Sequence, residues 1–254
     1  MSRHLPNLLR LAGLALLLAF LVAPSSFAPL FAPLTQNGAP PIYTQSSLLA
    51  LTGSHLATVF LAGLASTLVA VGLGIFVTRP AGAEFLPLSR AIVNIGQTFP
   101  PVAVLALAVP AVGFGAAPTL IALFLYGLLP IFENTLSGLG EVPGDVVDAA
   151  RGMGMSERQR LLQVELPLAL PVILEGVRLS LVINLGTATI GSTVAAKGLG
   201  EVIIAGLLSN NTAFVLQGGL VVGAVAVLLY DGMRLLEQRL ALAIGVPARR
   251  AGQG

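Results

Sequence analysis

Charged residues are scarce in this sequence of 254 residues, since Asp, Glu, Lys and Arg together make up only 9% of it. Soluble domains carry about 25% charged residues, because their surfaces must face water. With 56% hydrophobic residues and a mean hydropathy of +0.92, the chain has too few charged side chains to cover a globule in water. We therefore expect its outer surface to contact lipid.

Other residue types are rare or missing, and each absence excludes a class of site. Cysteine is absent, which excludes a disulfide framework, a thiolate metal site and a cysteine nucleophile. The two histidines, His4 and His55, lie far apart near expected helix ends, and we interpret them as interfacial residues rather than metal ligands. The net charge of +2, without a long basic run, argues against a nucleic-acid partner.

Six apolar stretches are candidates for membrane-spanning helices. A bilayer core of about 30 Å needs roughly 20 apolar residues per helix. The runs are continuous rather than alternating, which favours helices over membrane strands. We therefore expect an all-α, polytopic membrane protein of about six transmembrane helices. The expected spans are Leu8–Ala23, His55–Thr78, Ala91–Phe114, Pro118–Phe132, Leu168–Ile190 and Ala213–Tyr230.

The basic residues indicate which helix ends face the cytoplasm, because Lys and Arg accumulate on cytoplasmic segments. Eleven of the 13 basic residues fall on one expected side, and Arg178 lies within the fifth span. The opposite loops, near 24–54, 115–117 and 191–212, contain only Lys197. Both termini are therefore expected in the cytoplasm. The eleven residues are Arg3, Arg10, Arg79, Arg90, Arg151, Arg158, Arg160, Arg234, Arg239, Arg249 and Arg250.

The first span has a second interpretation. Its two arginines and the Leu-rich run that ends at Ala23 resemble a secretory signal peptide. We favour a retained span, because no clean A-x-A cleavage site follows and Pro24 is unfavourable for cleavage. The segment from Ala23 to Ser47 is rich in Pro, Ser and Gly and is expected to form an irregular external loop. The chain then divides into an N-terminal span with its loop (1–50), a membrane core (51–240) and a cytoplasmic tail (241–254).

The most charged stretch covers residues 141–171 (EVPGDVVDAARGMGMSERQRLLQVELPLALP), and its charge places it outside the hydrocarbon. Pro143 suits the first turn of a helix, which Gly152 and Gly154 then interrupt. Ser156, followed by Gln159, predicts a capping box that begins a second helix, and Pro167 is expected to mark the return into the membrane. The stretch is therefore expected to form two helices with a break between them. Periodicity alone leaves open an amphipathic connector that rests on the lipid surface.

The spacing in this stretch resembles the EAA loop of ABC importer permeases. The pattern of that family is Glu-Ala-Ala, three residues, Gly, nine residues, Ile, one residue and Leu-Pro. Two positions depart conservatively, since Asp148 stands for Glu and Val164 for Ile. The matching residues are Asp148, Ala149, Ala150, Gly154, Val164, Leu166 and Pro167.

The resemblance implies a type I importer permease, with a core of five helices and here one additional N-terminal helix. Residues 141–167 would form a cytoplasmic coupling loop that docks into a groove on separate ABC ATPase subunits, so that closure of the ATPase pair moves the spans. The chain itself carries no P-loop, because its single lysine, Lys197, is followed by Gly198. ATP and Mg are therefore expected on the partner, and no cofactor is expected on this chain. A second permease copy or a homologous permease is also implied.

Three further segments resemble permeases of osmoprotectant uptake systems, within about residues 50–240. Those systems import quaternary-ammonium solutes such as glycine betaine, choline or carnitine, which an extracytoplasmic solute-binding protein delivers. A permease of the same class for another small solute, such as an amino acid, remains an alternative. The segments are NIGQTFPP at 94–101, LPIFENT at 129–135 and GLG at 198–200.

Polar residues inside the expected spans are costly to bury and are therefore functional candidates. One cluster lies in the third span and another in and just after the fifth, and both supply the neutral hydrogen-bonding groups that a zwitterion needs. The alternative is that these side chains hold helices together. The candidates for a translocation pathway are Asn94, Gln97, Thr98, Asn184, Thr187, Thr189 and Thr193, with Ser192 beside them.

Two other classes of function fit this sequence less well. A secondary transporter or channel usually places titratable groups deep in its bundle, whereas the ionisable residues here lie near the expected interfaces. Glu175 and Arg178, one turn apart, are interpreted as an interfacial ion pair, with a gate latch as the alternative. A membrane enzyme needs a nucleophile with a base, or a cluster of His and Asp, which the sequence lacks. We expect a transport subunit rather than an enzyme.

Overall fold

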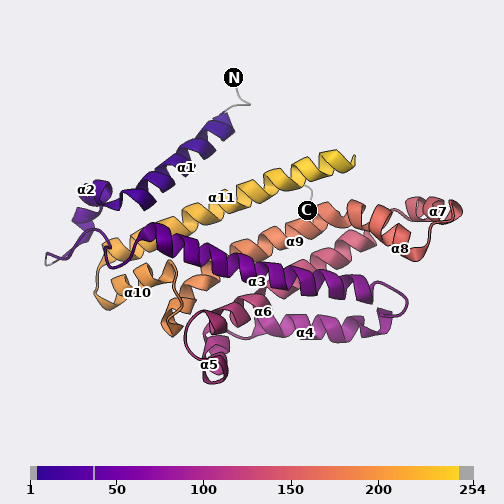
Figure 1. Ribbon diagram of the computed structural model, residues 1–254, viewed down its shortest axis with the longest axis horizontal. Helices are drawn as coiled ribbons and strands as arrows, with labels where there is room; N and C mark the ends of the chain where they lie inside the picture. The colour runs from indigo at the N-terminus through magenta and orange to yellow at the C-terminus, as the bar shows by residue number, and fades with distance from the viewer. Residues whose placement is uncertain (1–4, 37, 246–254) are drawn as a thin grey trace. The chain divides into compact units, whose positions relative to one another are not determined.

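The structure is a computed structural model in which residues 5–36 and 38–245 are described. The expected all-α class is confirmed, because these described residues form helices joined by turns and contain no strand (Figure 1). The expectations for Arg3, His4, Arg249 and Arg250, and for the two chain ends, concern residues outside the described part. The expected division into residues 1–50, 51–240 and 241–254 stays a prediction.

Four long helices carry most of the apolar sequence, namely α3 (Leu48–Val77), α6 (Ala116–Gly140), α9 (Leu166–Thr187) and α11 (Thr212–Ile244). Shorter helical segments connect or extend them. The shorter segments are α1 (Leu5–Val22), η1 (Pro24–Phe27), α2 (Ala28–Phe31), η2 (Ala32–Leu34), η3 (Ala83–Phe85), α4 (Leu86–Thr98), α5 (Pro101–Val112), α7 (Gly144–Gly152), α8 (Glu157–Arg160), the π-helical turn η4 (Leu161–Glu165), η5 (Ala188–Val194) and α10 (Gly200–Leu208).

Among the described residues, four helices are long and apolar enough to cross a membrane, or six crossings exist if two bent helix pairs each count as one. The expected third span, Ala91–Phe114, is one of these pairs and not a straight helix. Its halves, α4 and α5, are bent by 96°. The break falls at Phe99 and Pro100, because two consecutive prolines cannot donate the backbone hydrogen bonds that would continue α4. The N-terminal span is the other pair, bent by 109° between residues 22 and 24.

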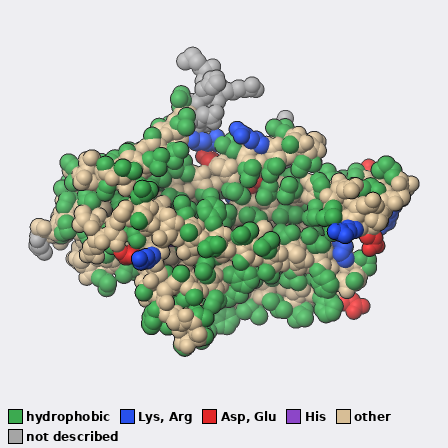
Figure 2. Space-filling model, in the orientation of Figure 1, with side chains coloured by type: hydrophobic (Ala, Val, Ile, Leu, Met, Phe, Trp, Pro, Cys, Tyr) green, Lys and Arg blue, Asp and Glu red, His purple; other side chains and the backbone are tan. Residues whose placement is uncertain are grey.

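The surface of these helices is apolar. Hydrophobic side chains cover most of the visible face in Figure 2, and charged side chains gather at a few places on it. Leucines such as Leu61, Leu64 and Leu68 on α3 are more than half exposed. A surface of this kind cannot face water over such an area, so it is the lipid-facing surface that the composition predicted.

Two segments differ from the sequence expectations. Helix α10 lies in the region 191–212, which was expected to be a loop; Gly200 allows it to approach η5 so closely that a Cβ there would overlap the carbonyl oxygen of Thr189. The expected loop from Ala23 to Ser47 begins with the short helices η1, α2 and η2. Phe20 packs on Phe27 and Phe31, with ring centroids 5.2 and 5.6 Å apart, and holds this bend.

The described residues form two compact units, and the four long helices contribute residues to both. The first unit comprises the described residues of Met1–Ala62, Phe99–Leu123 and Val182–Leu229. Within it, side chains at the start of α11 bind the segment before α3: Asn211, which directly precedes α11, donates to the carbonyl of Pro40 at 2.9 Å, and Gln217 of α11 donates to that of Pro41 at 2.7 Å. This part of the loop has no regular secondary structure, as expected, and hydrogen bonds fix it to α11.

Tyr43 is the most deeply buried aromatic residue of this segment. Its backbone N–H donates to Gln217, and its hydroxyl donates to the carboxylate of Glu201 at 2.7 Å. Its ring packs edge-on against Phe214. Burial raises the pKa of the Tyr43 phenol to about 12, and the hydrogen bond and charge of Glu201 act in the same direction.

The second unit comprises the described residues of Gly63–Thr98, Phe124–Leu181 and Tyr230–Gly254. Its core is built from α3, α4 and α6 around the fully buried Ile131 and Phe132. Glycines let α6 and α9 approach closely: a Cβ on Gly127 would lie 2.7 Å from the hydroxyl of Ser180, and one on Gly176 would lie 2.7 Å from the carbonyl oxygen of Pro130. Close backbone contact through small residues is the usual packing of membrane helices.

Candidate functional site

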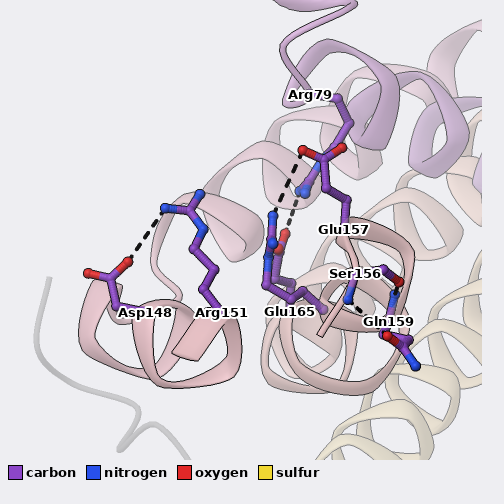
Figure 3. Close-up of polar contacts among 8 residues, drawn as sticks. Arg79, Asp148, Arg151, Ser156, Glu157, Gln159 and Glu165 are labelled. Atoms are coloured by element: carbon purple, nitrogen blue, oxygen red, sulfur yellow. Dashed lines mark hydrogen bonds and ion pairs between the residues drawn. The ribbon is translucent and has the colours of Figure 1, made fainter. Parts of the chain in front are cut away.

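The first helix of the loop between α6 and α9 is α7. Pro143 precedes it in an extended conformation and ends the preceding turn. Asp145 lies in the first turn and Arg151 in the last, so both charges oppose the helix dipole favourably. Ala150 faces inward and is buried, whereas Asp148 points outward and pairs with Arg151 at 3.5 Å (Figure 3). The short helix at this position is thus built from local signals.

The end of α7 is a Schellman motif. The N–H of Met155 donates to the carbonyl of Ala150, five residues back, and the N–H of Gly154 donates to that of Arg151. The motif requires a left-handed residue between these bonds, and Gly154 supplies it with a φ of +80°. The glycine of the sequence pattern is therefore the residue that terminates α7 and reverses the chain.

A capping box begins the next helix, as the sequence predicted. The hydroxyl of Ser156 accepts from the N–H of Gln159, and the side chain of Gln159 accepts from the N–H of Ser156 at 2.8 Å. Two free donors at the N-terminus of α8 are satisfied in this way (Figure 3). The motif at Gly154 and this box leave only a short connection between α7 and α8.

Pro167, which was expected to mark the return into the membrane, does not interrupt the helix. Helix α8 continues through the π turn η4 into α9, and residues 157–194 form one long helix. In the π turn the N–H of Leu166 donates to the carbonyl of Leu161, five residues back. A proline in a helix lacks its N–H and crowds the carbonyl four residues earlier, and a widened π turn relieves this crowding. The second helix of the loop is therefore continuous with a span.

The pattern residues lie on two faces of this loop. Helix α7 packs against α8 and against the π turn. Asp148, Ala149 and Gly154 are exposed, whereas Val164, Leu166 and Pro167 are partly buried at the start of the long helix. Met153 is 75% exposed, and no sequence pattern had indicated it as a site residue. An exposed methionine beside a rigid helix is a typical protein contact surface, because its side chain adapts to a partner.

Glu165 is the buried acidic residue of the loop, and its partner comes from a distant segment. Its carboxylate accepts from the guanidinium of Arg79 at 2.5 Å, and the two residues are 86 positions apart (Figure 3). Arg79 lies in the turn after α3. The sequence placed Arg79 at a helix end but gave no indication of its partner.

The first group of pathway candidates lies on α4. Asn94, Gln97 and Thr98 are all exposed in the single chain. Gln97 donates to the carbonyl of Tyr126 at 3.3 Å, and the hydroxyl of Thr98 donates to Ile95 on its own helix. The structure thus brings the three side chains together on one apolar helix, at the end where α4 breaks.

The second group lies at the end of α9 and in η5. Asn184 is fully buried and donates to the carbonyl of Leu123 at 3.1 Å, while its amide oxygen has no hydrogen-bond partner. Thr187, Thr189 and Thr193 each donate to a carbonyl of their own helix. The contact of Asn184 is the one expected if it joins helices, and the role of all these residues in a pathway stays a prediction.

Two other polar residues inside the helices are placed by the structure. Arg178 pairs with Glu175, as expected, but also with Glu237 at 2.9 Å, and its guanidinium lies 4.6 Å from the ring centroid of Tyr230. His55 is buried rather than interfacial, because α3 begins seven residues earlier, and its Nε2 lies 3.0 Å from the carbonyl oxygen of Leu185. Among the described residues, no group of three His, Cys, Asp or Glu side chains could hold a metal ion.

Several known proteins are similar to this chain in sequence. Residues 70–242 match the family described as binding-protein-dependent transport system inner membrane component. The chain is 42% identical over 196 residues to the osmoprotectant import permease protein OsmY of Salmonella typhimurium, an alignment that covers 77% of this chain and 83% of the relative. It is 36% identical over 194 residues to the choline transport system permease protein OpuBB of Bacillus subtilis, covering 76% and 88%.

The fold is also similar to that of a solved structure, the inward-facing MetNI methionine ABC transporter. The TM-score is 0.64 with 25% identity, and the similarity covers 78% of this chain and 95% of that one. The family match contains the whole of the 141–167 loop and all seven pathway candidates.

Proposed function

Because this chain belongs to the family of binding-protein-dependent transport system inner membrane components, we propose that it is the membrane-spanning permease subunit of an ATP-driven importer, with ATP bound and hydrolysed on separate ABC ATPase chains. It is a multi-pass membrane protein, and both of its termini lie in the cytoplasm. Transport proceeds by alternating access: ATP binding opens the external side, and hydrolysis resets the inward-facing state. The sequence has no P-loop pattern, which supports the assignment of ATP hydrolysis to separate chains and of transport to this one.

The observation that carries this proposal is the construction of the 141–167 loop. A Schellman motif and a capping box fix α7 against the start of a helix that continues into a span. Val146, Asp148 and Met153 are exposed on this rigid piece. The loop therefore has the form of a lever, with an outer face that docks into the ATPase and an inner end that is continuous with α9.

The proposed solute is a quaternary ammonium osmoprotectant such as choline, glycine betaine or carnitine. The names of the relatives at 36–42% identity support this class, since they are an osmoprotectant and a choline permease. The polar candidates of α4 and α9 are neutral, so they offer hydrogen bonds to a zwitterion or cation without trapping it by charge. An extracytoplasmic solute-binding protein delivers the solute to the permease.

A second permease, either an identical copy or a homologue, completes the pathway. Asn94, Gln97 and Thr98 are exposed on α4, where lipid could not satisfy the hydrogen-bonding groups that the contacts of Gln97 and Thr98 within the chain leave over. Contact with a second permease or with a water-filled path between the two removes this cost. The exposed polar side of α4 supports such an arrangement.

Reconstitution into lipid vesicles tests the proposal. The chain is co-expressed with the ATPase and binding protein of its own operon or locus, purified, and assayed for ATP hydrolysis and for uptake of choline, glycine betaine, carnitine and methionine. We expect the ATPase to co-purify and at least one quaternary ammonium solute to stimulate hydrolysis and accumulate. Stimulation by methionine alone would replace the osmoprotectant with an amino acid, and uptake in vesicles without any ATPase would contradict the importer itself.

A further inference from the structure

The ion pair between Arg79 and Glu165 differs from the other ion pairs of the loop. Asp148 with Arg151, and Glu157 with Arg160, pair within one helical turn, and both acidic side chains are about three quarters exposed. Such pairs do not join their helix to any other element. Glu165 is 7% exposed and its partner lies on another element, so this pair joins the loop to a distant part of the second unit.

The turn that presents Arg79 is rigid. The N–H of Arg79 donates to the carbonyl of Phe76, and its own carbonyl accepts from Gly82 at 2.9 Å. A Cβ on Gly82 would overlap the backbone of Phe76, so the turn closes tightly because this residue is glycine. A displacement applied to the guanidinium of Arg79 is therefore carried into the backbone of the turn rather than absorbed by a loose loop.

This turn leads directly into the helix with the polar candidates. Helix α4 begins at Leu86, a few residues after Gly82, and carries Asn94, Gln97 and Thr98. Further along, Arg90 of α4 forms a two-pronged pair with Glu133 of α6, with distances of 2.7 and 3.0 Å. The contact at Arg79 is thus the first in a chain of contacts from the loop to the polar side of α4 and to α6.

We propose that Arg79 and Glu165 are positioning residues that transmit the movement of the coupling loop to the α3–α4 turn and so to α4. The inference rests on the proposed function, since it assigns a second route by which an ATPase would move the permease. The first route is the continuous helix from α8 into α9. The second begins in the π turn, where Glu165 lies between the pattern residues Val164 and Leu166.

Two routes are needed because α9 is not covalently continuous with α4. A lever acting on α9 alone would move that helix past α4, and the pathway candidates are divided between the two. With the ion pair in place, loop movement reaches both groups together. Without it, the ATPase would still bind and hydrolyse ATP, but α4 would lag behind α9.

Charge reversal separates this role from a purely structural one. The variants are Arg79→Glu, Glu165→Arg and the double reversal, assayed in the reconstituted complex for ATPase co-purification, solute-stimulated hydrolysis and uptake. Each single reversal places two like charges together, and we expect uptake to fall by about tenfold or more while hydrolysis stays within about twofold, the size of effect typical of coupled pairs. The double reversal restores most of the uptake.

A matched control lies in the same turn. Glu84 is exposed in η3, five residues from Arg79, so Glu84→Arg makes a charge reversal of the same size without touching Glu165. We expect its uptake to equal that of the wild type. Arg79→Gln, which removes the charge without adding repulsion, serves if a reversal fails to fold, and its expected result is the same rise in ATP consumed per solute carried.

The outcomes distinguish this inference from the proposed function. A wild-type complex without ATP-dependent uptake contradicts the importer. A working wild type whose single reversals transport normally, or whose double reversal stays as defective as the singles, overturns the role of the pair. A parallel loss of co-purification, hydrolysis and uptake in Arg79→Gln shows a folding contact and overturns it as well.

Discussion

Replacing Gly154 with alanine is expected to destabilise the coupling loop by about 1–2 kcal/mol, because its φ of +80° holds the residue in the left-handed region. An added Cβ would meet no atom within 4 Å, so the cost is one of backbone conformation and not of steric overlap. This free energy corresponds to about a 5- to 30-fold change in the ratio of closed to opened loop. Amide hydrogen exchange across residues 144–165 of the purified protein measures that ratio directly.

Gly152 provides the matched control, two residues earlier. It also has no atom within 4 Å of an added Cβ, but it lies in the last turn of α7 with a helical backbone. Gly152→Ala is therefore expected to leave exchange unchanged or to slow it, since alanine in a helix is favoured by about 0.5–1 kcal/mol over glycine. Gly154→Asn should lie between, because asparagine tolerates the left-handed region. Equal exchange in Gly152→Ala and Gly154→Ala would refute the reasoning.

Three further changes test other parts of the structure. Ser156→Ala should speed exchange at the start of α8 by the equivalent of about 1 kcal/mol, whereas Ser156→Asp keeps the cap and the wild-type rate. Gly176→Ala should lower the melting temperature, since its Cβ would lie 2.7 Å from the carbonyl oxygen of Pro130 at a cost of about 1–3 kcal/mol; Gly186→Ala on the same helix has open space and should not. The Tyr43 phenol, whose pKa rises from 10.0 to about 12 on folding, contributes stability that is complete below pH 10.0 and is lost as pH rises through about 12. Thermal melts should show this loss in the wild type and not in Tyr43→Phe, and equal slopes would contradict it.

The parts of the 141–167 loop that the sequence predicted are those that depend on contacts between neighbouring residues. The capping box at Ser156, the helix start after Pro143 and the interruption at Gly154 each depend on hydrogen bonds between residues three to five positions apart. Such contacts can be read from residue order, because the chain brings the partners together whatever the rest of the fold does. The apolar stretches, which hold the four long helices and the two bent pairs, were predictable for a similar reason, since hydropathy is a property of each segment by itself.

Hydropathy measures how apolar a segment is, but not whether its helix is bent. Three features of the structure were therefore not predicted from the sequence. The run Ala91–Phe114 is apolar on both sides of Pro100, so its 96° bend leaves the apolar signal unchanged. The region 191–212 was expected to be a loop, yet it contains α10, and Gly200 allows this helix to approach η5 closely. The π turn before Pro167 depends on how a helix accommodates a proline, and no sequence pattern indicated it.

The ion pairs between distant residues could not be predicted from the order of residues in the chain. Arg79 with Glu165, Arg90 with Glu133 and Arg178 with Glu237 are separated by 86, 43 and 59 residues. All three join two elements of the second unit, which also carries the coupling loop. In the first unit the described contacts between distant segments are mainly neutral, as those of Asn184, Asn211 and Gln217 show. Because a half-buried charge is costly without a partner, these charges are placed in pairs that join two elements. That placement is what the charge reversals at Arg79 and Glu165 examine.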